Sequence, residues 1–196
     1  MSRLVDPLRI ACGAATARLV WLCAALTGCS GGDGTSVDAP PGVFSLSSPS
    51  LANNAGFDPA NTCDGADSSP ELVFANNPVD AGSLAVILVD HSVQPAGLVH
   101  WVLYDIPPTA TGLPAGVAAG YEPANVAGAH QSIGLNGDRQ YHGPCPPALH
   151  TYSFDVYALP EPTLPGATMD TTKEDAAENI TAHQGAHATL TGTYQH

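Results

Sequence analysis

The chain has 196 residues, of which 44% are hydrophobic and 12% are charged, with five Lys and Arg against 18 Asp and Glu. This length and apolar content predict one folded domain of roughly 150 residues that carries an appendage. The formal net charge of −13 repels phosphate backbones, so we expect the protein to bind no nucleic acid.

The first 28 residues have the layout of a bacterial export signal. Three arginines precede an uncharged segment, residues 19–28, which is too short to span a bilayer stably. The segment ends in Leu-Thr-Gly before Cys29, which resembles the lipobox of bacterial lipoproteins. We expect residues 1–28 to be a lipoprotein signal peptide and Cys29 to carry the lipid. An ordinary secretory signal cut nearby, or a buried N-terminal helix, is the alternative.

Residues 29–42 are rich in Gly, Ser, Asp and Pro and have no apolar periodicity, which predicts a flexible tether. The folded domain is therefore expected over residues 43–196. Removal of the signal would leave two basic residues, Arg139 and Lys173, against 17 acidic ones. We therefore interpret the protein as exported and anchored through lipid at Cys29 to a membrane of the cell envelope, either in the periplasm or at the cell surface.

Short apolar or alternating segments bounded by Pro, Gly and Asn predict mostly strands. One helix is predicted over residues 170–184, with Asp170 or Thr171 as its N-cap and Glu174 and Asp175 near the positive end of its dipole. The pattern favours a mainly β sandwich with a peripheral helix. The predicted strands cover residues 44–48, 71–74, 84–89, 100–106, 151–159 and 189–194.

The segment from Tyr141 to Leu159 reads YHGPCPPALHTYSFDVYAL and carries the most information. Its three prolines fix the backbone of a rigid turn at little entropic cost to the folded state. The alternating strand that follows directs every second side chain to one face, so His150 and Tyr152 point the same way. The arrangement predicts a preformed pocket for a small ligand.

This GPCPP turn, followed by H-x-Y and a VYAL strand, is similar to the phosphatidylethanolamine-binding protein family, in its bacterial Raf kinase inhibitor-like branch. The resemblance implies a Greek-key β-sandwich with a few peripheral helices, and it extends from about Val43 to Tyr194. Further matching segments are FSLSS at 44–48, TCDG at 62–65, SPEL at 69–72, SLAVILVD at 83–90, HWVLYDIP at 100–107 and LTGTY at 190–194.

The resemblance also implies a ligand pocket in which imidazole and phenol groups face a phosphoryl oxygen. Matching positions supply the polar groups, and the proline-rich turn supplies a wall whose backbone N–H groups can add donors. The polar residues are Asp90, His100, His150 and Tyr152, and the wall residues are Tyr141, Gly143 and Pro144.

Asp90 opens a segment that departs from the family pattern. Where the family has D-P-D-A-P, this chain has Asp-His-Ser-Val-Gln-Pro over residues 90–95, which loses the second acid and adds one residue. This difference puts the ligand preference on that side of the pocket in doubt. A carboxylate repels a phosphate dianion, so zwitterionic headgroups or phosphate monoanions fit better, and binding should strengthen as pH falls and the histidines are protonated.

Cys63 and Cys145 are the pair that remains after export, and they form either a disulfide or two buried thiols.

The sequence gives little support to a catalytic or metal site. Neighbouring Asp90, His91 and Ser92 point to opposite faces of an extended chain, and there is no G-x-S-x-G motif. His183 and His187 are interrupted by Gly185 and lack a third ligand with motif spacing, so we expect no metal and no cofactor.

The sequence thus predicts a non-enzymatic lipoprotein that binds small anionic or zwitterionic phosphoryl ligands, such as phospholipid headgroups. One alternative is an inhibitor of an exported protease, or an interaction protein for another envelope enzyme. Another is a hydrolase that uses the pocket acid and histidines.

Overall fold

The computed structural model describes residues 42–196. The predicted signal peptide and, except for Gly42, the predicted tether lie outside these residues. The elements in chain order are β1 (Ser45–Ser47), β2 (Ala55–Gly56), the 3-10 turn η1 (Pro59–Asn61), β3 (Leu72–Ala75), β4 (Ser83–Asp90), β5 (Leu98–Ile106), β6 (Gly112–Leu113), β7 (His130–Gln131), β8 (His150–Leu159), α1 (Lys173–His183) and β9 (His187–Tyr194).

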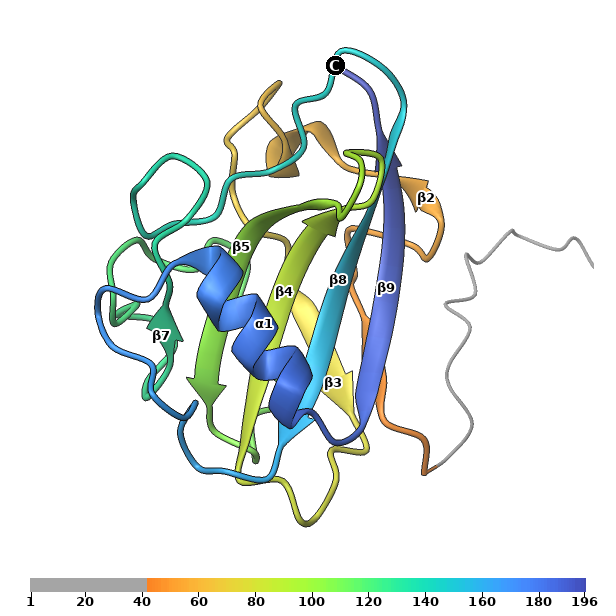
Figure 1. Ribbon diagram of the computed structural model, residues 1–196. Coiled ribbons are helices and arrows are strands. Elements are labelled where there is room, and N and C mark those ends of the chain that lie inside the picture. The colour runs from red at the N-terminus through yellow and green to blue at the C-terminus, as the bar shows by residue number, and fades with distance from the viewer. Residues whose placement is uncertain (1–41) are drawn as a thin grey trace, which may run out of the picture. The chain divides into compact units, whose positions relative to one another are not determined.

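These strands form two sheets that pack against each other. The larger sheet has the order β2-β9-β8-β4-β5-β7, and β2 alone runs parallel to its neighbour. The smaller sheet has the order β1-β3-β6 and is antiparallel throughout. Figure 1 shows α1 crossing one face of the large sheet, with β3 behind the other face.

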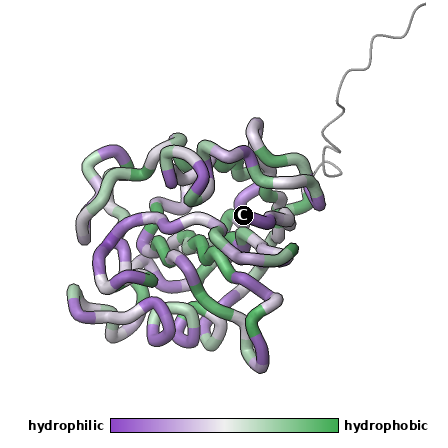
Figure 2. The backbone as a smooth tube through the Cα atoms, turned by 90° about the horizontal axis from the view of Figure 1, so that it is seen from above, coloured by the Kyte–Doolittle hydropathy of each residue, from purple (hydrophilic) through white to green (hydrophobic). Residues whose placement is uncertain are grey.

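The alternation of side chains along β8 divides the core into two parts. Tyr152, Phe154 and Val156 face the small sheet and belong to the larger apolar cluster, which lies between the sheets. Tyr157 and Leu159 face the opposite side, where a smaller cluster packs beneath α1. Figure 2 shows the hydrophobic stretches crossing the middle of the molecule, with hydrophilic stretches in many outer loops.

The mainly β sandwich and all six predicted strands are confirmed, within one or two residues at each end. The two-residue strands β2, β6 and β7 are not predicted, because two residues are too few to show a period. Instead of a few helices, the described residues hold one α-helix and one 3-10 turn. That helix does not have the length and apolar character needed to cross a membrane.

The predicted N-cap of the helix is wrong by one or two residues. Thr172 caps α1, and its Oγ1 accepts a hydrogen bond from the backbone N–H of Asp175 at 3.2 Å. The carbonyl of Thr172 accepts the first helical hydrogen bond, from the N–H of Ala176 at 2.9 Å, whereas the carbonyl of Thr171 accepts from the N–H of Ile133 at 2.9 Å in a neighbouring segment. The predicted acidic first turn, with Glu174 and Asp175, is present.

Candidate functional site

The predicted pocket residues Asp90, His100, His150 and Tyr152 lie together at one end of the large sheet, and we call them the Asp90 cluster. Asp90 is the last residue of β4, and it pairs with Tyr152 on β8 in the antiparallel register, so both side chains point to the same face. Its carboxylate Oδ2 accepts from His150 Nδ1 at 2.7 Å, and its Oδ1 accepts from the backbone N–H of Ser92 at 2.8 Å. The hydroxyl of Tyr152 also interacts with Asp90, lowering the pKa of the carboxyl and raising that of the phenol.

His100 joins this group because of a β-bulge. Leu88 and Val89 of β4 pair with Trp101 and Val99 of β5, so His100 has no partner in the ladder. Strict alternation would send His100 and Trp101 to opposite faces, but the extra residue re-aims the side chain. The imidazole therefore lies edge-on to the ring of Tyr152, with ring centroids 5.5 Å apart, while Trp101 still packs in the core between the sheets.

Both histidines are held through Nδ1. His100 Nδ1 lies 3.1 Å from the carbonyl oxygen of His142, and His150 Nδ1 lies 2.7 Å from the carboxylate of Asp90. A carbonyl and a carboxylate only accept, so each Nδ1 carries the proton and donates. No described residue forms a hydrogen bond with Nε2 of either ring, which leaves both Nε2 atoms to a ligand.

Burial and hydrogen bonding shift the pKa values of this cluster. Burial opposes ionisation of Asp90, but the hydrogen bonds from His150, Ser92 and Tyr152 outweigh it and lower its pKa. Burial lowers the pKa of His100, although the carbonyl of His142 and the charge of Asp90 partly offset the effect. Burial and the neighbouring carboxylate of Asp90 raise the pKa of Tyr152. At neutral pH the cluster therefore contains a charged Asp90, a neutral His100 and a neutral phenol.

The predicted wall residues form the rigid turn beside this cluster, and their polar groups bond within the protein. The hydroxyl of Tyr141 donates to the carbonyl of Asn61 at 2.8 Å, and its ring packs edge-on against Trp101. The N–H of Gly143 donates to Asp67 Oδ1 at 2.7 Å, so it is not a free donor. A Cβ at Gly143 would lie 2.1 Å from the carbonyl oxygen of Asn61, which explains the glycine.

His142 is a further component that the sequence analysis did not single out. Its carbonyl holds His100, and its ring lies between two carboxylates, with Nε2 2.9 Å from Asp138 Oδ1 and Nδ1 3.3 Å from Asp67 Oδ2. Asp67 has a left-handed backbone, with φ of 50°. The contribution to His100 comes from a main-chain atom, which every residue type carries, so the sequence offers no signal for it.

The turn is also tied to the segment after η1. Cys63 and Cys145 form a disulfide with their Cα atoms 5.4 Å apart, and the N–H of Cys63 donates to the carbonyl of Pro144 at 3.2 Å. Both cysteines are exposed, so the alternative of two buried thiols is not what the structure contains.

The Asp90 cluster is largely covered. Asp90, His100 and Tyr152 are buried, whereas the side chain of His150 is 22% exposed and forms the accessible edge. Two hollows, of about 390 and 560 Å³, lie elsewhere, at residues 122–130 and along β3 and β6. We place the candidate site at the cluster because its polar groups converge there, whereas the hollow along β3 and β6 is lined mainly by apolar residues and that at 122–130 by small ones.

The geometry of Asp90, His91 and Ser92 is not that of a hydrolase triad. The imidazole of His91 turns to Ser153 at 2.7 Å, on the opposite face of β8, while Ser92 bonds Asp90 through its backbone. Ser153 in turn donates to Asp155 at 2.5 Å. The serine therefore lies between the histidine and the acid, whereas in a hydrolase triad the histidine lies between the serine and the acid.

The comparisons with known proteins agree on one family. The sequence profile of the phosphatidylethanolamine-binding protein family matches residues 47–195. LppC of Mycobacterium tuberculosis, described as a candidate lipoprotein, is 32% identical, with 92% of this chain and 94% of LppC covered. A UPF0098 protein of Methanothermobacter thermautotrophicus is 38% identical over 136 residues, covering 68% of this chain and 87% of that protein.

Solved structures give the same answer. The crystal structure of Escherichia coli YbcL, described as a member of the mammalian PEBP family, has a TM-score of 0.71 and 25% identity and covers 78% of this chain and 98% of YbcL. CT736 of Chlamydia trachomatis, described as a candidate homologue of the same family, has a TM-score of 0.67 and 30% identity, with 79% and 99% covered. The chain belongs to the phosphatidylethanolamine-binding protein family and has its fold.

Proposed function

We propose that this member of the phosphatidylethanolamine-binding protein family binds a small zwitterionic phosphoryl ligand, of the phospholipid-headgroup type, at the Asp90 cluster. The observation that supports it best is the pair of imidazoles, His100 and His150, which are both fixed through Nδ1 and both leave Nε2 without a partner among the described residues. The wall of the pocket is the turn with Tyr141, Gly143 and Pro144.

The charge of the cluster favours a zwitterion over a bare phosphate. Asp90 is ionised at neutral pH, because its pKa is lowered despite its burial, and it repels a phosphate dianion nearby. An ammonium group close to Asp90 removes that repulsion. The phosphoryl group then lies against the imidazoles, whose Nε2 atoms become donors to its oxygens when the rings are protonated.

The proposed activity is binding without chemistry. His100 and His150 bond to a carbonyl and a carboxylate respectively, and no described hydroxyl or thiol bonds to either ring in the position of a nucleophile. A serine or cysteine nucleophile needs such a base within hydrogen-bond reach.

We also propose that the protein is exported and anchored through lipid at Cys29. The support is the candidate lipoprotein LppC, which is similar over 92% of this chain. Mass spectrometry of the envelope fraction tests the anchor. We expect a diacylated peptide that begins at Cys29, and its absence, with a free Cys29 or cleavage elsewhere, would contradict the anchor.

Calorimetry with glycerophosphoethanolamine tests the ligand class, with inorganic phosphate and ethanolamine as separate arms. We expect the zwitterion to bind more tightly than either fragment, and His150→Gln to weaken it about tenfold, the size of a lost hydrogen bond to a charged group. The matched control is His187→Gln, because His187 is an exposed histidine at the start of β9 that stacks on Tyr157.

Equal affinity of the His150→Gln and native proteins for glycerophosphoethanolamine would contradict the proposed site. Binding of phosphate alone as tightly as the zwitterion would keep the site but reject the role of the ammonium group. A stoichiometric envelope protein that copurifies, and that the His150→Gln variant retains, would instead favour the inhibitor or interaction function.

A further inference from the structure

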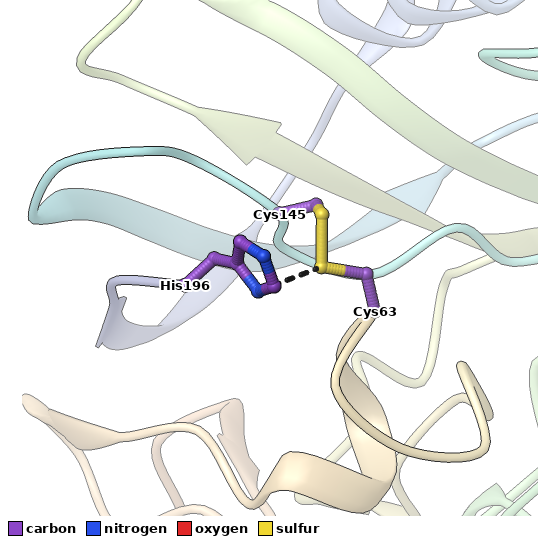
Figure 3. Close-up of side chains that lie close together, drawn as sticks. All are labelled: Cys63, Cys145 and His196. Carbon is purple, nitrogen blue, oxygen red and sulfur yellow. Dashed lines mark hydrogen bonds between the residues drawn. A yellow bond between two sulfur atoms is a disulfide. The ribbon is translucent and has the colours of Figure 1, made fainter.

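A second cluster of reactive side chains lies at the proline-rich turn and takes no part in the proposed function. The sulfurs of Cys63 and Cys145 and a ring nitrogen of His196 all lie within 4.8 Å of one another, and all three residues are exposed. Figure 3 shows the imidazole of His196 turned toward the sulfur of Cys63, and Nδ1 of the ring lies 3.8 Å from that atom. We call these three residues the Cys63 corner.

His196 is held in place by contacts on both sides of the disulfide. Its backbone N–H donates to the carbonyl of Pro146 at 3.0 Å, next to Cys145, and its Nδ1 lies 2.5 Å from Asp64 Oδ1, next to Cys63. The hydroxyl of Tyr194 also bonds Asp64. The imidazole is therefore positioned by the protein and not by the disulfide.

The two cysteine-bearing segments are joined by non-covalent contacts as well. The N–H of Cys63 donates to the carbonyl of Pro144, Tyr141 donates to Asn61, and Gly143 donates to Asp67. Two of these donors are buried, and Gly143 lies directly against the backbone of Asn61. After reduction of the disulfide, these contacts keep the two thiols close together.

We propose that Cys63, Cys145 and His196 form a binding site for a thiophilic metal cation, Zn²⁺ or a chemically similar ion, when the two cysteines are in the thiol form. Two thiolates and one imidazole, with water in the fourth position, are a common ligand set for tetrahedral zinc. Asp64 accepts from Nδ1 of the same imidazole, which leaves Nε2 as the nitrogen that binds the metal, and a carboxylate on the other ring nitrogen orients a metal-bound histidine and raises its basicity. The acidic charge of the protein adds a general attraction for cations.

The chemistry is thiol exchange followed by ligation. A chain that has not yet been oxidised carries both thiols, and a dithiol reductant regenerates them by taking the disulfide bond in exchange for its own two hydrogens. Binding of Zn²⁺ then forms two zinc–sulfur bonds and releases two protons. Oxidation of the cysteines removes both thiolate ligands, so the disulfide and the metal exclude each other.

The test uses the full chain with Cys12, Cys23 and Cys29 changed to Ser, so that Cys63 and Cys145 are its only cysteines. A phosphine reductant converts the disulfide and one water to two thiols and a phosphine oxide, and Co²⁺ then serves as the spectroscopic probe for zinc. We expect one equivalent of Co²⁺ to give a thiolate charge-transfer band that Zn²⁺ abolishes. The oxidised protein, which is the same chain with the disulfide intact, should give no band.

Three variants separate this site from adventitious binding. His196→Ala should weaken Zn²⁺ at least tenfold, and Asp64→Asn should weaken it about tenfold through the orientation of the ring. His183→Ala is the matched control, since His183 is an exposed histidine whose ring bonds a carbonyl within α1, and it should leave the affinity unchanged.

A reduced chain that gives no thiolate band would overturn the proposal, and so would equal affinity in the His196→Ala and native chains. Circular dichroism accompanies each titration. If the reduced chain were unfolded and stayed unfolded with Zn²⁺, the non-covalent contacts would not hold the corner together, and the proposal would fail on that ground.

Discussion

The Asp90 cluster and the Cys63 corner both adjoin the same proline-rich turn, but they are built in opposite ways. Strand register brings Asp90 and Tyr152 together, and the cluster is buried apart from the edge of His150. The Cys63 corner is exposed and is assembled by turns and by a residue 133 positions away from Cys63. The comparison indicates that the first is a property of the sheet, whereas the second depends on the turn and on long-range contacts that close across it.

The largest expected effect is on stability, and it distinguishes the Cys63 corner from the Asp90 cluster. Replacement of both Cys63 and Cys145 by Ser opens a loop with a sequence separation of 82 residues. By loop-closure entropy this lowers the free energy of unfolding by about 4.5 kcal/mol. Urea denaturation measures the loss, and binding of glycerophosphoethanolamine to the folded variant should stay within about twofold of native, because the register of β4 and β8 does not involve the crosslink. A parallel collapse of binding would mean that the two regions are not independent.

A change at Gly143 should damage both regions at once. The Cβ of Gly143→Ala would lie 2.1 Å from the carbonyl oxygen of Asn61, so the turn must move. Overpacking of this kind costs about 1–3 kcal/mol, and we expect the upper end because the obstacle is backbone. Urea denaturation measures the loss. Gly137→Ala is the contrast, since nothing lies within 4 Å of a Cβ there, and only its left-handed φ of 79° is strained. A Gly143→Ala protein as stable as the native one would contradict the clamped turn.

Tyr152→Phe should act on the Asp90 cluster alone. The ring keeps its contacts with Phe57 and His100, but the cluster loses the hydroxyl that interacts with Asp90. We expect about tenfold weaker binding of glycerophosphoethanolamine in calorimetry, from the loss of one hydrogen bond to a charged group. Tyr157→Phe is the matched control, because it makes the same change on the same strand but on the opposite face. Equal losses in the two variants would contradict a site at Tyr152.

The smallest effect is expected from pH, and it again concerns only the Asp90 cluster. Because the pKa of His100 lies below its usual 6.5, the folded state holds this ring neutral and gains stability above pH 6.5 that is lost as pH falls below it. A bound phosphoryl group favours the protonated ring, so affinity should rise in the same window. Glycerophosphoethanolamine suits the measurement, because its phosphodiester keeps the same charge across this pH range. Affinity that is flat below pH 6.5, or that falls, would contradict a role for His100 in anion binding.

Much of the fold could be predicted because it depends on local patterns. Alternation along residues 151–159 gives both faces of β8, and the same alternation places Tyr152 inside. His100 is different, since its direction depends on a bulge that becomes visible only when β4 and β5 are paired. The family resemblance supplied its role, whereas alternation alone would have pointed it away from Tyr152.

Other parts of the two regions had no signal in the sequence. His142 acts through its carbonyl, and Asp67 adopts a left-handed backbone that a non-glycine residue seldom takes. The proximity of His196 to Cys63 depends on how the chain closes across the turn, through contacts with Asp64 and Pro146. Such long-range contacts follow from the packed structure, and neither the spacing of residues nor a hydrophobic period in the sequence predicts them.

Isotope-edited NMR of the imidazole nitrogens during titration with glycerophosphoethanolamine tests the central claim most directly. The account predicts that the Nε2 resonances of His100 and His150 shift together and saturate with one equivalent, while that of His187 stays in place. Shifts confined to other histidines, or no shift at His100 and His150 at saturating ligand, would contradict a ligand site at the Asp90 cluster.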